Sequence, residues 1–234
     1  MFQFKQFSVD QTGCAMKINT DGVLLGALAD ADTPKCILDI GTGTGVIALM
    51  MAQRFPSAII DAVEIDYTAA ITAHNNFKDS PFARRLNTYP TDFRNFFKAH
   101  PTAEFDVIVS NPPFHLNSLE SPQAKKSLAK HTGSDFFEDL IESSARHLTI
   151  QGLLWLILPL ETADLVKELA GRFGLYLQKQ IAVHSFSHSE PHRLIVSLGF
   201  IKVSAEISKL VIYDAVNSYS KEYVKLLQPY FIAY

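Results

Sequence analysis

The sequence lacks the features that mark a secreted or membrane-bound protein. It has only two cysteines, Cys14 and Cys36, which are too few for a disulfide framework and are not spaced as a metal-binding pair. The longest apolar run, Leu153 to Leu160, is far too short to cross a bilayer. No basic segment followed by an apolar stretch opens the chain, as a signal peptide would require. These absences predict a cytoplasmic protein with no membrane partner.

Internal repeats, low-complexity tracts and blocks of like charge are also absent. The 234 residues carry a formal net charge of −3, and 47% of them are hydrophobic, which is typical of a globular protein. This length predicts a single domain. The slight excess of acidic residues is unusual for a protein that binds nucleic acid, where a basic chain is the ordinary expectation. The oligomeric state is left open, and a monomer is compatible with the sequence.

Short apolar runs alternate with helical patterns from residue 36 onward, which is typical of a mostly parallel sheet covered by helices. The expected strands are Cys36–Ile40, Ala58–Glu64, Leu86–Tyr89, Phe105–Ser110, Leu153–Leu158, Leu175–Val183 and Arg193–Ile201. The expected helices are Val46–Phe55, Tyr67–Lys78, Asp135–Leu148 and Thr162–Arg172, with a further short strand at Leu210–Tyr213 and a helix near Lys221–Gln228.

The pattern predicts an α/β fold with a Rossmann-like, doubly wound sheet of about seven strands. Only a loop joins Leu175–Val183 to Arg193–Ile201, so these two strands should pair antiparallel at that edge of the sheet. The segment His115–Ser134 contains Pro122 and shows no period. We expect a loop there, and loops of that length are usually functional.

A glycine-rich loop follows the first expected strand and precedes the first expected helix. The stretch from Leu38 to Gly45 places Asp39 near the strand end and glycines at every second position, Gly41, Gly43 and Gly45. Glycines let the backbone turn sharply and approach a ligand closely. Because Val46 follows Gly45, the dinucleotide pattern G-x-G-x-x-G fails, and the loop suits a cofactor without a pyrophosphate.

Acidic residues also follow the next two strands. Glu64 lies 19 residues after Gly45, where a carboxylate can accept both hydroxyls of a ribose. Asp92 could accept a hydrogen bond from the amine of an adenine ring that Phe93 backs. The alternative is that Asp39 only caps a helix and that Glu64 is a solvated strand end.

The fourth strand runs directly into the tetrapeptide Asn111, Pro112, Pro113 and Phe114. Two prolines fix the backbone and remove two amide donors, so the turn presents carbonyls and the Asn111 side chain. Such acceptors suit a planar amine, whose ring could stack on Phe114. The alternative is an ordinary strand-to-helix turn with a buried Phe.

These motifs together resemble class I S-adenosylmethionine-dependent methyltransferases, in the branch that modifies planar amino nitrogens. The resemblance implies the class I methyltransferase fold and S-adenosylmethionine as cofactor. It implies that the loop Gly41–Gly45 meets the methionine part of the cofactor and that Glu64, with the adjacent Ile65, binds the ribose. Asp92 and Phe93 would bind the adenine, and Asn111–Phe114 the target amine.

The resemblance extends over nearly the whole chain to bacterial enzymes that methylate N6 of adenine 37 in the anticodon loop of tRNA1(Val). It is carried by further segments: Phe4–Phe7, Cys14–Lys17, Thr20–Ala27 and Pro191–Arg193. It implies a tRNA partner and an N-terminal segment, residues 1–34, that covers the cleft of a catalytic core at 35–234. Thr20 and Asp21 would then contact the cofactor. Phe114 stands where Tyr is common, which keeps the stacking surface but not the hydroxyl.

Basic residues near the tetrapeptide are the expected RNA contacts. We expect phosphate or substrate contacts from Lys125, Lys126, Lys130, His192 and Arg193, together with Lys5 and Lys17. The alternative is a solvated surface loop. His184, His188 and His192 recur every four residues like ligands on a helix, but Pro191 and the strand-like flanks argue against a helix, so no metal is expected.

Four other functions share some of these features. An adenine-N6 methyltransferase acting on rRNA or DNA remains open, although DNA enzymes usually carry a target-recognition domain. A glutamine N5-methyltransferase acting on a protein would normally have an N-terminal helical domain, for which the residues before Cys36 leave no room. A non-catalytic binding module is disfavoured by the intact tetrapeptide, and an NAD-dependent oxidoreductase by Val46.

Overall fold

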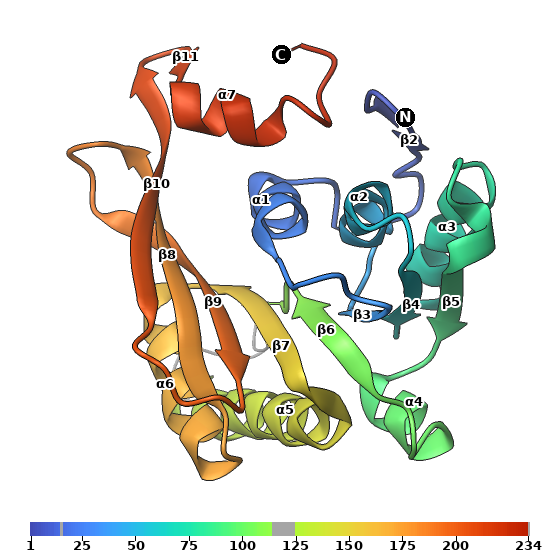
Figure 1. The fold of residues 1–234 in the computed structure, drawn as a ribbon, viewed down its shortest axis with the longest axis vertical. Helices are drawn as coiled ribbons and strands as arrows, with labels where there is room; N and C mark the ends of the chain where they lie inside the picture. Colours follow the sequence, from blue (N-terminus) through green and yellow to red (C-terminus); the bar gives the residue numbers. More distant parts are fainter. Residues whose placement is uncertain (15, 114–124, 234) are drawn as a thin grey trace.

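A mixed β-sheet forms the centre of the protein in this computed structural model, which describes residues 1–14, 16–113 and 125–233 and leaves the side chains of residues 125–134 outside that description. The nine-stranded sheet has the order β11-β10-β8-β9-β7-β6-β3-β4-β5 (Figure 1). In that order the strands are Ser218–Tyr219, Glu206–Ala215, Tyr176–Phe186, Pro191–Gly199, Leu148–Leu158, Phe105–Ser110, Cys36–Ile40, Ile59–Glu64 and Leu86–Pro90.

The expected doubly wound α/β architecture is confirmed, with differences at one side of the sheet. Strands β5, β4, β3, β6 and β7 are parallel, and β9 pairs antiparallel with both β7 and β8. The antiparallel pairing of β8 with β9 is therefore as predicted, but β9 lies inside the sheet. Strands β10 and β11 extend the sheet beyond β8, so the expectation of about seven strands was too low.

Helices cover both faces of the sheet and enclose two hydrophobic cores (Figure 1). One layer contains α1 (Thr20–Leu28), α2 (Val46–Arg54), α3 (Tyr67–Lys78) and α7 (Lys221–Leu227), and the other contains α4 (Phe93–Ala99), α5 (Lys125–His147) and α6 (Leu160–Arg172). A short antiparallel hairpin of β1 (Phe2–Gln3) and β2 (Ser8–Val9) lies apart from the main sheet. Among the described residues, no helix combines the length and the apolar character that crossing a membrane requires.

Three α-helical segments were not expected from the sequence. Helix α1 has buried residues on all sides, including Val23, Leu24 and Leu25, so it lacks the amphipathic period that marks a surface helix. Helix α4 is short, and its boundary is set by Asp92, which caps its N-terminus. Helix α5 already begins at Lys125, so the loop expected for residues 115–134 is wrong from residue 125 onward; residues 115–124 lie outside the described chain.

Parallel pairing brings the loops after four strands to one edge of the sheet. In the register of the sheet, Ile40 at the end of β3 is opposite Val63 of β4 and Ser110 of β6, and Glu64 at the end of β4 is opposite Pro90 of β5. In doubly wound sheets, ligands bind in the crevice outside these carboxyl ends. The fold therefore gathers the glycine loop, the acidic residues and the Asn-Pro-Pro turn at one place.

The Arg85 side chain connects the 3-10 helix η1 (Ala83–Arg85) to the C-terminal end of α2. Its guanidinium donates hydrogen bonds to the carbonyl oxygens of Ala52 at 2.8 Å, Phe55 at 3.0 Å and Ala58 at 2.8 Å. Ala52 and Phe55 lie at the C-terminal end of α2, where carbonyls lack intrahelical partners, and Ala58 directly precedes β4. Arg85 thus acts inside the fold and is not free to contact a ligand.

We predict that Arg85→Met lowers the free energy of unfolding by about 2 kcal/mol, because three carbonyls lose a charged donor. The adjacent Arg84 is exposed and provides a matched control, since Arg84→Met should change stability by less than about 0.5 kcal/mol. Urea denaturation of the two variants checks this. Equal stability of both variants would contradict the role given to Arg85.

Candidate active site

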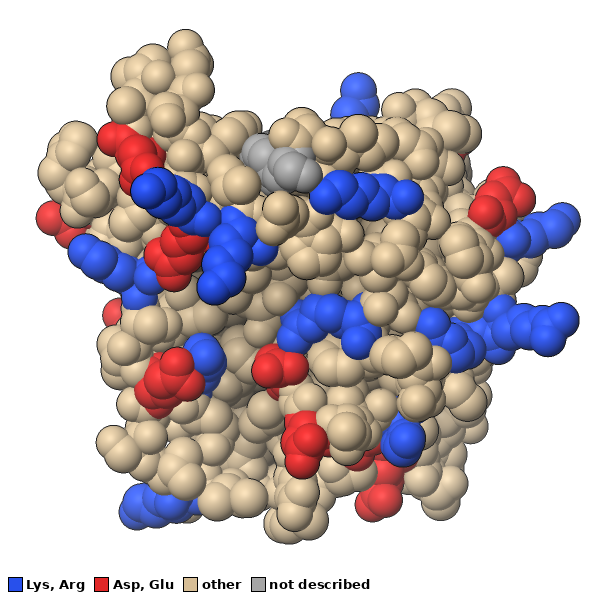
Figure 2. Space-filling model, turned by 45° about the horizontal axis from the view of Figure 1, so that its top comes forward, with Lys and Arg blue, Asp and Glu red and all other residues tan. Residues whose placement is uncertain are grey.

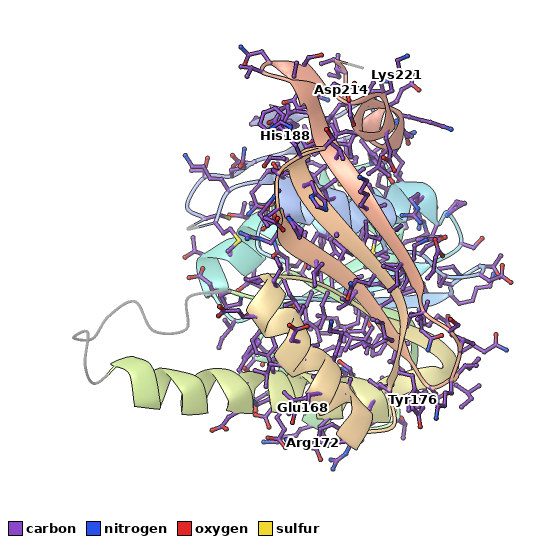
Figure 3. All side chains as sticks on the ribbon, turned by 90° about the vertical axis from the view of Figure 1, so that its left-hand side faces the viewer. Glu168, Arg172, Tyr176, His188, Asp214 and Lys221 are labelled. Carbon is purple, nitrogen blue, oxygen red and sulfur yellow. The ribbon has the colours of Figure 1, made fainter. Side chains whose placement is uncertain are left out.

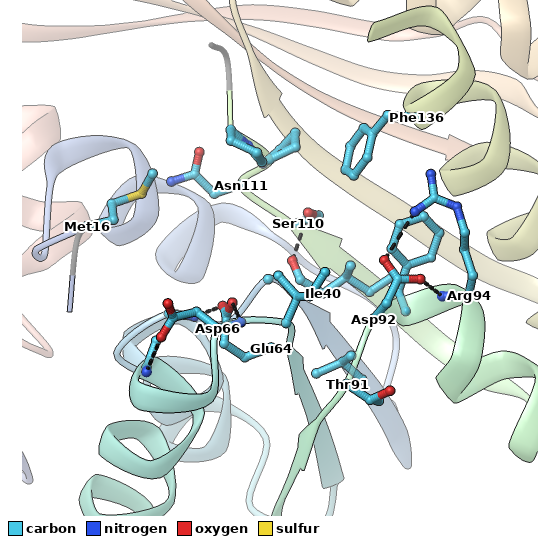
Figure 4. A pocket seen from close by; sticks show the side chains of 18 of the residues that line it. Met16, Ile40, Glu64, Asp66, Thr91, Asp92, Arg94, Ser110, Asn111 and Phe136 are labelled. Atoms are coloured by element: carbon cyan, nitrogen blue, oxygen red, sulfur yellow. Dashed lines mark hydrogen bonds and ion pairs between the residues drawn. The ribbon is translucent and has the colours of Figure 1, made fainter. Parts of the chain in front are cut away.

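A cavity of about 420 Å³ lies at the carboxyl edge of β3, β4, β5 and β6 (Figure 4). This volume is in the range of small-molecule sites. Figure 4 shows Asn111 and Phe136 on one side of the cavity and Glu64 and Asp92 on the other. The predicted site residues that line it are Gly41, Gly43, Glu64, Ile65, Asp92, Phe93, Asn111, Pro112 and Pro113.

The glycine loop leaves β3 in a conformation that only glycine adopts easily. Gly41, Gly43 and Gly45 have φ values of 73°, 56° and 84°. A Cβ on Gly45 would overlap the Phe77 ring, so Gly45 is required for packing α2 against α3. At Gly41 and Gly43, by contrast, a Cβ would meet nothing within 4 Å. These two residues leave open backbone along the cavity for a ligand to approach.

The Glu64 carboxylate holds two loops together at the cavity wall. Its Oε2 accepts a hydrogen bond from the Gly43 amide at 2.8 Å, and its Oε1 accepts one from the Asp66 amide at 2.9 Å. A carboxylate has about four acceptor positions, so each oxygen can still accept from a hydroxyl. Ile65 beside it is 71% exposed and offers an apolar surface to the same cavity.

Asp39 is completely buried beneath the glycine loop. Its Oδ2 accepts a hydrogen bond from the Thr42 hydroxyl at 2.6 Å. Burial raises the pKa of Asp39 to about 7; the Thr42 hydroxyl and the Ala48 backbone amide lower it, and the nearby Glu64 raises it further. The loop therefore contains a carboxyl group that is only partly ionised near neutral pH.

Asp92 and Phe93 begin α4 at the far side of the cavity. Asp92 accepts a hydrogen bond from the Arg94 amide at 2.8 Å and forms an ion pair with the Arg94 guanidinium at 3.1 Å. That guanidinium lies 4.6 Å from the centre of the Phe93 ring and also pairs with Asp139 at 2.6 Å. Asp92 is thus held in place beside the cavity, and Arg94 is fully engaged within the protein.

Asn111 presents an unsatisfied acceptor at the cavity. Its Oδ1 is buried and has no hydrogen-bond partner within the part of the chain that the structure describes. The strand end below it is fixed because the Ser110 hydroxyl donates to the Ile40 carbonyl at 2.8 Å. Because Asn111 also lines the cavity, this oxygen is a candidate acceptor for a ligand there. Phe114, the last residue of the tetrapeptide, lies outside the described residues.

The N-terminal segment closes a second hollow beside the glycine loop. Lys17, Asn19, Gly22 and Asn111 are among the residues that line it. Asn19 caps α1 by accepting a hydrogen bond from the Gly22 amide at 2.9 Å. An added Cβ on Gly22 would lie 3.9 Å from Asn111 Nδ2, so the start of α1 packs close to Asn111. Thr20 is exposed and lines neither hollow.

Asp21 and Arg193, predicted for cofactor and substrate respectively, form an ion pair with each other. The Arg193 Nε lies 2.8 Å from Asp21 Oδ2, and both side chains are mostly buried. Arg193 Nη1 also donates to the His192 carbonyl at 2.8 Å. The pair ties α1 to the start of β9, and the binding roles of both residues remain predictions.

The structure describes only some of the remaining residues that were predicted to contact RNA. The side chains of Lys125, Lys126 and Lys130 lie outside the described part of the structure, and Lys5 Nζ donates to the Gln228 carbonyl at 2.6 Å. Figure 2 shows Lys and Arg side chains lying among Asp and Glu on the face it presents.

His184 and His192 lie on strands and His188 lies in the turn between them, as the absence of a helical pattern predicted. His192 is half-buried, its Nδ1 has no partner among the described residues, and burial lowers its pKa. In the described ranges, no cluster of three or more metal-type side chains is present.

Several cavity residues were not identified from the sequence. Arg94, Asp66 and Phe136 line the main cavity, and Asn19 lines the second hollow. Asn19 could have been identified from the sequence as the start of a helix, because Asn directly before an apolar stretch commonly caps a helix. Phe136 was assigned to an amphipathic helix, but nothing in the local pattern indicates that it faces a cavity.

Comparison with known proteins agrees with this geometry. A model of the methyltransferase small domain family matches residues 17–179. The chain is 46% identical over 233 residues to a tRNA1(Val) (adenine(37)-N6)-methyltransferase of Pedobacter heparinus, covering 100% of this chain and 98% of that relative. Relatives of the same name from Bacteroides thetaiotaomicron and Tolumonas auensis are 41% and 38% identical, each over 99% of this chain and over 97% and 96% of their own lengths.

Solved structures share the fold at low sequence identity. A predicted O-methyltransferase from Agrobacterium tumefaciens superposes with a TM-score of 0.68 at 20% identity, covering 90% of this chain and 96% of its own. TrmN from Thermus thermophilus gives a TM-score of 0.55 at 21% identity, covering 77% of this chain and 48% of its own. These likenesses establish the fold of a class I methyltransferase.

We predict that Asp39→Asn stabilises the unliganded protein in a pH-dependent way. The pKa of Asp39 is about 7 when folded, against an ordinary value of 3.8. Between these values the folded protein holds a proton that the unfolded chain releases. The free energy of unfolding therefore falls by up to about 1.4 kcal/mol per pH unit as the pH rises. The amide side chain of the variant is neutral, so it avoids this loss of stability at high pH. Its oxygen can still accept the hydrogen bond from the Thr42 hydroxyl.

Urea denaturation of wild type and Asp39→Asn at about pH 5 and about pH 8 measures this difference. The stability advantage of the variant should be larger at the higher pH. The same advantage at both pH values would contradict a raised pKa for Asp39.

We further predict that Arg193→Met or Asp21→Asn loosens α1, at a cost of about 1 kcal/mol, because each leaves a mostly buried charged partner unpaired. Amide hydrogen exchange should accelerate in α1 but not in α6. Arg146→Met is a suitable control, since the Arg146–Glu142 pair is largely exposed and should contribute little. Unchanged exchange in α1 would show that the pair does not hold this helix.

Proposed function

Since the chain belongs to the methyltransferase small domain family, alongside bacterial tRNA1(Val) (adenine(37)-N6)-methyltransferases, we propose that it transfers a methyl group from S-adenosylmethionine to N6 of an adenine in tRNA. The proposed target is adenine 37 in the anticodon loop of tRNA1(Val). One observation carries the proposal: the buried Oδ1 of Asn111, a cavity-lining residue beside two prolines, has no hydrogen-bond partner among the described residues.

The cavity fits the proposed cofactor. Gly41 and Gly43 leave a cradle that a Cβ would fill, which suits the methionine part of the molecule. Glu64 has free acceptor positions for ribose hydroxyls, and Asp92 with Phe93 offers an acceptor and a ring edge for adenine. When bound, S-adenosylmethionine supplies an electrophilic methyl group on a sulfonium.

Asn111 and the Pro112 carbonyl would orient the target amine. Each can accept one N–H of the adenine amino group, and together they keep its nitrogen lone pair available for attack. The attacking amine is neutral, so no general base is needed before transfer, and the product loses its proton to solvent. Catalysis then depends mainly on positioning, for which effective molarities of about 10⁵–10⁸ M are available.

An unpaired loop is a favourable substrate for such a site. The target base must leave its stack to reach the cavity, which costs a few kcal/mol and least where the base is unpaired. We propose that the N-terminal segment, residues 1–34, covers the cofactor cleft of a single catalytic domain. Its residues Cys14 and Met16 line the main cavity, and Lys17, Asn19 and Gly22 the second hollow.

The test of this function is nucleoside analysis of bulk tRNA from cells with and without the protein. We expect N6-methyladenosine to disappear from one tRNA when the protein is absent. Unchanged tRNA together with a loss of methylation in rRNA would overturn the proposed substrate.

We predict that Asn111→Ala lowers kcat by roughly 100-fold, because the acceptor that orients the amine is lost. The Kd for S-adenosylmethionine, measured by isothermal titration calorimetry, should be nearly unchanged. Asn87→Ala, which alters an exposed amide bonded only to Asp61, is the matched control and should retain wild-type turnover. Weaker cofactor binding with normal kcat would show that Asn111 serves the cofactor instead.

A further inference from the structure

Five rings follow one another in contact at one end of the sheet, in a row that we call the aromatic column. The Tyr223 and Tyr219 rings lie 5.0 Å apart at 15°, and Tyr219 lies 5.0 Å from Tyr213 at 23°. Tyr213 is 5.7 Å from Phe186 in a tilted contact at 37°, and Phe186 stacks on His188 at 5.7 Å and 15°. The column thus runs from α7 through β11, β10 and β8 to the turn after β8.

The column is anchored at one end and open at the other. Tyr223 is only 5% exposed and belongs to the hydrophobic core. It lies in α7, which Ser220 caps by accepting a hydrogen bond from the Tyr223 amide. His188 is exposed, with Phe186 against one face of its imidazole. A ring supported in this way is preorganised, so a ligand that stacks on its outer face meets little cost in conformational entropy.

The open end of the column lies at the same edge of the sheet as the active site. Strand β8 runs in the same direction as β7, because both are antiparallel to β9, so His188 follows a carboxyl strand end. Figure 3 shows His188 at the end of β8 opposite to Tyr176.

A chain of strand pairings and side-chain contacts links β8 to Asn111. Pro191 of β9 is paired with His184, and Phe186 lies two residues, about 7 Å, further along β8. Two residues after Pro191, Arg193 is bonded to Asp21 of α1, whose first turn packs close to Asn111.

We propose that the outer face of His188 is a stacking site for an unpaired base of the RNA substrate other than the base that enters the active site. The inference rests on the proposed function, since an anticodon loop supplies unpaired bases beside its target. Unpaired bases are commonly recognised by stacking on aromatic or His side chains. The bound base would become the next layer of the aromatic column.

The experiment compares the KM for a tRNA1(Val) transcript among His188→Ala, His188→Phe and wild type. His188→Ala should raise the KM roughly fivefold to tenfold, with kcat and cofactor affinity unchanged, because one stacking contact is lost. His188→Phe should give the wild-type KM, since it keeps an aromatic ring at this position.

Tyr176→Ala is the matched control. Tyr176 is 39% exposed and begins the same strand, about 33 Å from Phe186, so its loss should leave the KM unchanged. An unchanged KM in His188→Ala, a failure of His188→Phe to restore it, or an equal effect of Tyr176→Ala would each overturn the stacking site.

The two proposals fail in different ways. If wild type methylates no tRNA, the proposed function fails. The stacking site is then tested by fluorescence anisotropy, which compares the binding of the transcript to wild type and to the His188 variants. If wild type is active and the His188 variants bind and turn over tRNA normally, only the stacking site is overturned.

Discussion

The active-site region depends on one carboxylate that joins two loops. Glu64 accepts hydrogen bonds from the amides of Gly43 and Asp66, so the loops that open α2 and α3 are fixed to each other at the end of β4. The glycine loop can take this course because Gly41, Gly43 and Gly45 adopt positive φ. Without that link, the open backbone of the loop and the acceptors of Glu64 would not face one cavity. The geometry of the proposed cofactor site thus follows from a backbone conformation and a single side chain.

The distribution of charge explains why a net charge of −3 is compatible with RNA as a substrate. The acidic residues Asp39, Glu64 and Asp92 lie around the glycine loop and the cavity. Some basic residues act within the fold, since Arg85 holds three carbonyls and Arg94 pairs with two carboxylates. Neither the net charge of the chain nor the number of basic residues in a segment tells which basic residues act inside the fold and which contact a ligand.

Asp39 shows that the site has a cost in stability, because a buried carboxyl group destabilises the fold when it ionises.

The sequence was informative where local pattern determines structure. Alternating strands and helices predicted β3 to β7, and strand-end positions placed Glu64, Asp92 and Asn111 at one edge. Helix α1 was missed because its uniform burial removes the amphipathic period. The short strand expected at Leu210–Tyr213 lies within β10, but the length of β10 and the strand β11 were missed because their partners could not be inferred from spacing. The Asp21–Arg193 pair joins residues 172 positions apart, and the aromatic column joins β8 to α7. Such contacts arise from tertiary packing and leave no local signal.

We propose that this site aims a methyl group at the amino nitrogen of one adenine. Single-turnover transfer of labelled methyl from S-adenosylmethionine to two tRNA1(Val) transcripts, one with adenine and one with guanine at position 37, tests this directly. We expect label in the first transcript alone, recovered as N6-methyladenosine at that position. Equal labelling of the second transcript would contradict it.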